Sequence, residues 1–229
     1  MRELAPEADA LRLGCGWTLA DLGKPQILVE SVAGESHPNS VHLNDLSHDV
    51  RDGVIESGGR PARYDCTDLC DGIIQGTSAM DYSLPSREVM TMAVEMHARG
   101  GHFDGLVLVS GSDKAVPAHL LAAARLDMPA ILVPGGVMEP GPSGTTLPHE
   151  NMTLEQVGTI YAQLRRGLIS PHEYEFLRQE ACPTKGGCAF MGTSGTMQVM
   201  AEALGLAPLG SALRPANSFS MTRGCRQAG

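Results

Sequence analysis

Short apolar segments alternate with longer amphipathic segments through the first 136 residues, and this alternation restricts the fold more than any other feature. Four apolar segments have the length and composition of buried strands: 25–32, 61–67, 103–110 and 129–136. Between them, apolar residues recur at helical spacing in three segments: 40–59, 86–101 and 117–127. Strands that alternate with helices favour a mostly parallel sheet with flanking helices and right-handed crossovers. The pattern therefore predicts a single α/β domain over residues 1–229.

Local signals mark where several helices begin. Ser86 is a candidate N-cap, Pro117 lies near the start of its helix, and Ser170 is followed by Pro171. Three further helices are predicted at 153–167, 170–181 and 196–206. The segment 139–150 is rich in Gly, Pro, Ser and Thr and predicts a surface loop, whereas the tail 214–229 shows no apolar periodicity.

Composition excludes several functional classes. The chain has 229 residues and a net charge of −9, and its Lys and Arg residues form no run, which disfavours nucleic-acid and anionic-membrane partners. No apolar run is long enough to cross a bilayer, and the acidic, polar N-terminus does not match a secretory signal. The six cysteines have neither zinc-site spacing nor a secreted context. We therefore expect a cytoplasmic protein with reduced thiols that are core or incidental residues.

Charged residues follow two of the predicted strands. Asp71 comes after the second strand, and Asp113 and Lys114 come directly after the third. In parallel α/β sheets, ligands bind beyond the carboxyl ends of the strands. Mg²⁺ prefers oxygen ligands, so Asp71 and Asp113 are candidate ligands, although aspartate is also common in turns. Lys114 is either the partner in a plain ion pair or, after carbamylation by CO2, an oxygen donor.

A second candidate site lies at the start of the helix after "YSLPSRE". Ser83, Ser86 and Arg87 place hydroxyls and a guanidinium near free backbone N–H groups, which suits a carboxylate or phosphate. The alternative is a well-capped helix with an exposed arginine. The histidines, including His37 and His42, lack metal-ligand spacing and are interpreted mainly as surface or helix-packing residues.

Three blocks occur together in order. They are "CDGIIQGTSAMDYSLPSRE", "SGSDKAVPAHLLAAARLDMPAILVPGGVME" and "ACPTKGGCAFMGTSGTMQVMAEALGL". The chain resembles the dihydroxy-acid dehydratase family, which includes sugar-acid dehydratases and 6-phosphogluconate dehydratase. The resemblance implies the front part of the family's N-terminal domain. It also implies removal of water from a 2,3-dihydroxy acid through an enol, with Mg²⁺ and commonly an iron–sulfur cluster.

The resemblance assigns roles to individual residues. Asp71, Asp113 and carbamylated Lys114 match the family's Mg²⁺ ligands, and Lys114 is taken as catalytic. The match is poorer at the cluster ligands, because only Cys188 is a cysteine. Ser112 stands where the family has its C-D-K cysteine, and Asn39 or Ser40 stands at another cluster position. A serine hydroxyl is a poor iron ligand, so we expect no conventional cluster.

The chain is also shorter than family members, and the part it lacks contains a further Mg²⁺ glutamate and the serine taken as the base. Either the missing part is a separate polypeptide or the chain is a fragment. Of these we expect a subunit of a split dehydratase, with a second polypeptide, a hetero-oligomer with a dimeric core and a small hydroxy-acid substrate. Two alternatives remain. One is a non-catalytic scaffold or binding subunit. The other is a Mg²⁺-dependent enolising enzyme of a different reaction type.

Overall fold

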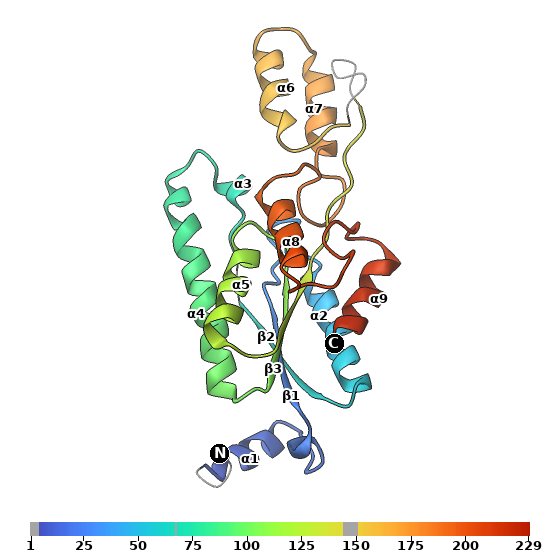
Figure 1. The fold of residues 1–229 in the computed structure, drawn as a ribbon. Coiled ribbons are helices and arrows are strands. Elements are labelled where there is room, and N and C mark those ends of the chain that lie inside the picture. Colours follow the sequence, from blue (N-terminus) through green and yellow to red (C-terminus); the bar gives the residue numbers. More distant parts are fainter. Residues whose placement is uncertain (1–4, 67, 144–150) are drawn as a thin grey trace.

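The computed structural model describes residues 5–66, 68–143 and 151–229 and contains a four-stranded parallel sheet (Figure 1). The strand order is β2-β1-β3-β4, and the strands are β1 (Gln26–Ser31), β2 (Arg60–Asp65), β3 (Gly105–Ser110) and β4 (Ala130–Pro134). Leu28 of the central strand β1 lies opposite Ala62 of β2 and Leu106 of β3. The α/β class with a parallel sheet is confirmed, and each strand falls within one of the predicted apolar segments apart from the first residue of β2.

Some of the helices cover the two faces of the sheet, and others lie beyond its ends (Figure 1). The helices are α1 (Glu7–Gly14), α2 (Leu43–Glu56), α3 (Asp71–Ile74), α4 (Ser83–Gly101), α5 (Ala115–Leu126), α6 (Gln156–Arg165), α7 (Pro171–Glu180), α8 (Thr193–Ala203) and α9 (Phe219–Ala228), with short 3-10 turns at Asp21–Gly23 and Ser78–Tyr82. Side chains alternate along β3, so Val107 and Val109 share a buried cluster with residues of α2 and α9. Leu106 and Leu108 point the other way and pack with α4 and α5. Figure 1 shows α4 and α5 on one side of the strands and α2 and α9 on the other.

The tail 214–229 contains a helix that the sequence pattern did not predict. In α9, Met221 and Cys225 are buried in the same cluster as Val50 of α2. Gly53 of α2 permits this close packing, because a Cβ at that position would collide with the backbone of Arg226. The apolar face of α9 is narrow, and it becomes evident only when α2 is beside it.

Two predicted helix starts are corrected and one is confirmed. α4 begins at Ser83, so Ser86 lies inside the first turn, where its hydroxyl donates to the Ser83 carbonyl at 2.7 Å instead of capping the helix. α8 begins at Thr193, three residues earlier than predicted. Ser170 is the N-cap of α7, and its hydroxyl accepts a hydrogen bond from the Glu173 N–H at 3.1 Å.

α6 and α7 pack on each other beyond the carboxyl ends of the strands (Figure 1). Their own small core contains Met152, Ile160, Ile169, Leu177 and Ala181. Much of the predicted loop 139–150 lies outside the described residues, although Gly141 and Met152 exchange backbone hydrogen bonds. Among the described helices, none combines the length and apolar character that a bilayer span requires.

Candidate functional site

The site begins where β2 and β3 end. β2 leads through Asp68 to α3, which starts at Asp71, and β3 leads through Ser112 and Asp113 to Lys114, which precedes α5. The carboxyl ends of parallel strands lie at one edge of a sheet, so the chain brings these residues together although they are more than 40 positions apart.

Asp71 is the best-connected residue of this group. Its Oδ2 accepts a hydrogen bond from Lys114 Nζ at 2.5 Å, and its Oδ1 accepts one from Ser83 Oγ at 2.8 Å. Both members of the ion pair are largely buried. The structure therefore joins three residues that the sequence assigned to the site, from α3, α4 and the segment before α5.

Asp113 lies within electrostatic reach of the same pair. Burial raises the pKa of Asp113, the positive charge of Lys114 opposes that rise, and the negative charge of Asp71 adds to it. The backbone N–H of Ser194, in α8, donates a hydrogen bond to Asp113. Two carboxylates beside one amine offer the oxygen ligands that a hard divalent cation prefers.

A second carboxylate group was missed by sequence reasoning. Ser112 Oγ donates to Asp68 Oδ2 at 2.5 Å, while Asp68 Oδ1 has no hydrogen-bond partner and lies 3.9 Å from His37 Nε2. Burial raises the pKa of Asp68 to about 7, and the hydrogen bond from Ser112 limits the rise. The sequence signal was weak, because Asp68 is one of several aspartates after the second strand.

His37 and His42 lie at the same edge of the sheet and are buried, so neither is a surface residue. One ring nitrogen of His42 is 2.7 Å from the carbonyl oxygen of Gly135. Burial lowers the pKa of both imidazoles, which favours their neutral forms. The turn before α2 is therefore held between the ends of the strands by buried side chains.

The predicted anion site at the start of α4 is only partly assembled. Ser83 is engaged by Asp71, and the Ser86 hydroxyl is used within the helix. Arg87 forms an ion pair with Glu88 at 2.9 Å. Contact of Ser86 and Arg87 with a substrate stays a prediction.

Thiols gather beside Asp113. Burial raises the pKa of Cys188 to about 12, and the negative charges of Asp113, Cys182 and Cys70 add to the rise. Within the described ranges, all the cysteines are free, and no three histidine, cysteine or carboxylate side chains form a group suited to a metal ion.

The remaining cluster positions present different donors. Ser112 and Asn39 are buried, and the Ser112 hydroxyl is committed to Asp68. An iron–sulfur cluster prefers thiolate ligands, so these oxygen donors do not fit the cluster that the resemblance implies.

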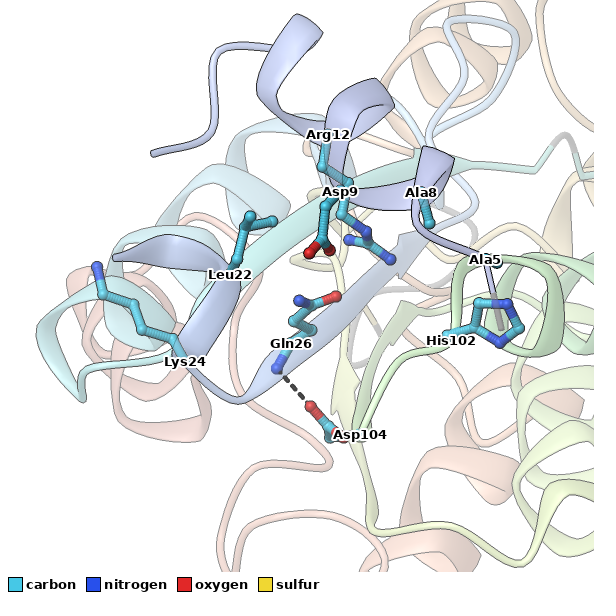
Figure 2. Close-up of a pocket in the computed structure, with 9 residues that line it drawn as sticks. All are labelled: Ala5, Ala8, Asp9, Arg12, Leu22, Lys24, Gln26, His102 and Asp104. Carbon is cyan, nitrogen blue, oxygen red and sulfur yellow. Dashed lines mark hydrogen bonds between the residues drawn. The ribbon is translucent and has the colours of Figure 1, made fainter. Parts of the chain in front are cut away.

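A separate cavity of about 320 Å³ lies at the opposite, amino end of the strands, under α1 (Figure 2). Its lining carries charges of both signs, from Asp9, Arg12 and Lys24. Asp104 in this cavity accepts a hydrogen bond from the Gln26 backbone N–H at 2.8 Å, which fixes the start of β1. The cavity is therefore structurally distinct from the carboxylates at the other end of the sheet.

Comparison with known proteins identifies the family. Residues 24–229 match the family described as dihydroxy-acid/6-phosphogluconate dehydratase N-terminal. The chain is 38% identical to dihydroxy-acid dehydratase of Caldanaerobacter subterraneus subsp. tengcongensis over 227 residues, which cover 99% of this chain and 40% of the relative. It is 41% identical to dihydroxy-acid dehydratase of Halothermothrix orenii over 210 residues, which cover 91% of this chain and 37% of that relative. The chain thus spans about 40% of the length of the curated relatives it matches. It belongs to the dihydroxy-acid/6-phosphogluconate dehydratase family and corresponds to the N-terminal part of its members.

Proposed function

We propose that this chain is the N-terminal subunit of a split dehydratase, a hydro-lyase that removes water from a 2,3-dihydroxy sugar acid or polyhydroxy acid. One observation carries the proposal: Asp71, Asp113 and Lys114 converge at the carboxyl end of the sheet in a chain of this family. In this proposal a second polypeptide would supply the part that matches the remaining length of the relatives.

Asp71, Asp113 and Lys114 would hold Mg²⁺ in this enzyme. The bound cation would supply positive charge to the substrate's carboxylate and C2 oxygen, which makes the C2 proton more acidic. Lys114 is largely buried beside Asp71. Loss of a proton from its ammonium group and addition of the amine to CO2, with release of a second proton, would give a carbamate that replaces the positive charge with oxygen donors. Ser83 fixes the orientation of the Asp71 carboxylate through its hydrogen bond.

The other steps divide between this chain and its partner. Ser83, Ser86 and Arg87 at the start of α4 would hold the acidic end of the substrate. A base from the second polypeptide would take the C2 proton, and the C3 hydroxyl would leave as water. No conventional iron–sulfur cluster takes part, in line with the oxygen donors at Ser112 and Asn39.

The outer face of α4 supports association with a partner. Apolar side chains recur at alternating spacings of three and four residues, and all are exposed: Tyr82, Pro85, Val89, Met92 and Met96. The exposed fractions of Val89, Met92 and Met96 are 60–64%. The opposite face of α4 is already buried against the sheet, and a helix that is apolar on both faces is typical of an interior position. A hetero-oligomer with a dimeric core would cover this face.

Two other functions have support from specific observations. Ser112 and Asn39 at cluster positions favour a non-catalytic scaffold or binding subunit. Retention of Asp71, Asp113 and Lys114 without those thiolates favours a Mg²⁺-dependent enolising enzyme that performs a different reaction.

The decisive experiment assays the chain together with the polypeptide that supplies the rest of the family sequence. A panel of 2,3-dihydroxy acids and sugar acids is screened for 2-keto acid formation. Asp113→Ala should lower kcat/KM by about 10³-fold, equivalent to roughly 4 kcal/mol of transition-state stabilisation. Asp45→Ala, on the exposed side of α2, is the matched control and should leave turnover unchanged. Equal activity of Asp113→Ala and the unmodified chain would rule out Asp113 as an essential ligand.

Association is tested separately. Met92→Glu places a charge in the apolar face of α4 and should prevent assembly with the second polypeptide in light-scattering measurements. Leu209→Glu changes a side chain that is 91% exposed elsewhere on the surface and should assemble normally. Normal assembly of Met92→Glu would exclude the outer face of α4 as the interface.

A further inference from the structure

We infer that Asp68, with Ser112 and His37, forms a second site at the carboxyl end of the sheet, which binds a hard divalent cation. This inference deepens the proposed function and rests on it, because the second cation would lie where the resemblance implies an iron–sulfur cluster. The resemblance assigns no role to Asp68 or His37.

The first argument concerns charge. Three carboxylates lie at this edge, from Asp68, Asp71 and Asp113. The charges of Asp71 and Asp113 raise the pKa of Asp68, and the charge of Asp71 raises the pKa of Asp113. Lys114 pairs with Asp71 and lies near Asp113. Asp68 receives hydrogen bonds from the Ser112 hydroxyl and the Leu69 backbone N–H, has no lysine or arginine paired with it among the described residues, and faces His37, whose pKa burial lowers. A buried carboxylate without a cation is costly, and a divalent cation would offset that cost.

The second argument concerns polar atoms without partners. The Asp68 side chain is 1% exposed, yet its Oδ1 has no hydrogen-bond partner. The His37 side chain is 2% exposed, and its Nε2, which faces Asp68, also lies 3.2 Å from Ser40 Oγ, a contact that a cation at Nε2 would replace. Asn39 Oδ1, in the same turn as His37, is also buried and without a partner. Buried polar atoms are rarely left in this state, and a bound ion is one explanation for them.

The third argument concerns size and donor type. Asp68 Oδ1 and His37 Nε2 are 3.9 Å apart, so a cation about 2.1 Å from each atom would fit between them at a wide angle. Carboxylate and hydroxyl oxygens suit Mg²⁺ or Mn²⁺, an imidazole nitrogen beside them favours a transition metal such as Mn²⁺ over Mg²⁺, and thiolates suit softer metals. The thiols of Cys70, Cys182 and Cys188 lie near Asp113 and would compete for zinc or iron. Mn²⁺ is therefore the appropriate probe, because it binds oxygen donors in preference to these thiols.

The experiment counts Mn²⁺ on the metal-free 229-residue chain, in bicarbonate buffer, by calorimetry and electron paramagnetic resonance. We expect two Mn²⁺ per chain. Asp68→Asn should lose one of them, and Asp113→Asn should lose the other. Glu30→Gln is the matched control, since Glu30 is also a buried carboxylate beside a histidine but lies on β1 against α4, and it should retain both.

A spectroscopic readout keeps the test independent of stability. Electron spin echo modulation from an imidazole nitrogen should appear in the Mn²⁺-loaded chain and vanish in His37→Gln. Thermal unfolding of metal-free Asp68→Asn shows whether this near-isosteric variant is folded, and if it is not, the His37→Gln signal decides.

Each contrary result has a separate meaning. One Mn²⁺ per chain that Asp68→Asn leaves in place overturns this inference and leaves the proposed function intact. One Mn²⁺ that depends on Asp68 but not on Asp113 supports the inference and overturns the Mg²⁺ assignment. Stoichiometric iron and sulfide in the anaerobically purified chain, lost in Cys188→Ser, would show that a cluster occupies the position instead.

Discussion

Glu30 and Asp68 are both buried carboxylates, but their surroundings differ. Glu30, on β1, is completely buried, and its two carboxylate oxygens lie 3.1 and 3.0 Å from His97 Nδ1. The ring of Tyr64 stacks on His97 with centroids 4.4 Å apart. Asp68, beyond the end of β2, has the hydroxyl of Ser112 and a more distant imidazole.

Burial raises the pKa of both carboxyl groups to about 7. For Glu30, the opposing influence is the charge and hydrogen bond of His97, and for Asp68 it is the hydrogen bond from Ser112. The interior of the sheet thus supplies Glu30 with a histidine in direct hydrogen-bond contact, whereas the nearest imidazole to Asp68 is 3.9 Å away. These different surroundings indicate that Glu30 serves the fold, whereas Asp68 is available to a ligand.

Removal of His97 should produce the largest change in stability. In His97→Leu, Glu30 stays buried without its partner, so the free energy of unfolding at pH 8 should fall by about 3 kcal/mol. Urea denaturation followed by circular dichroism measures the change. The double variant Glu30→Gln/His97→Leu should recover part of the loss, because its buried group is uncharged. A His97→Leu chain as stable as the unmodified one would show that Glu30 does not depend on this histidine.

Glu30→Gln should flatten the pH dependence of stability. The folded pKa of Glu30 is raised from the ordinary 4.5 to about 7, so its contribution to stability is present below pH 4.5 and is lost as the pH rises through about 7. That loss amounts to roughly 3 kcal/mol between pH 4.5 and 8, and the raised pKa from which it follows already includes the opposing effect of His97. In Glu30→Gln this part of the pH dependence should be absent from unfolding curves recorded across the range. An identical pH profile in both proteins would contradict the raised pKa.

The sequence predicted the elements that depend on local pattern. The strands were found because they are short apolar runs, and Ser170 was found because an N-cap followed by proline is a local signal. α9 was missed because few of its side chains are buried and its largest, Phe219, is exposed. Its position depends on close contact with Gly53, which is distant in the sequence.

In the candidate site, too, residues marked by a local pattern were predicted, and a contact between distant residues was not. Asp71, Asp113 and Lys114 were predicted as Mg²⁺ ligands from their positions after the strands and from the family motifs that contain them. The bond between Ser112 and Asp68 joins residues 44 positions apart, and no local pattern could predict it. Asp68 follows no strand directly and occurs among other aspartates, so only the packed sheet edge distinguishes it from a turn residue.

Asp68→Asn should give the smallest change in the free energy of unfolding. It also tests most directly whether Asp68 differs from Glu30. The folded pKa of Asp68 is raised, so the stability that its protonated form contributes is lost as the pH rises through about 7, and the neutral variant avoids this loss. At pH 8 the metal-free variant should therefore be about 1 kcal/mol more stable than the unmodified chain. Excess Mn²⁺ should reverse the order, because the folded chain that retains Asp68 binds two ions whereas the folded variant binds one, and each bound ion adds to stability. Thermal unfolding with and without Mn²⁺ measures both differences.

If metal-free Asp68→Asn instead loses 2 kcal/mol or more, Asp68 is compensated within the protein as Glu30 is, and the distinction between the two carboxylates fails.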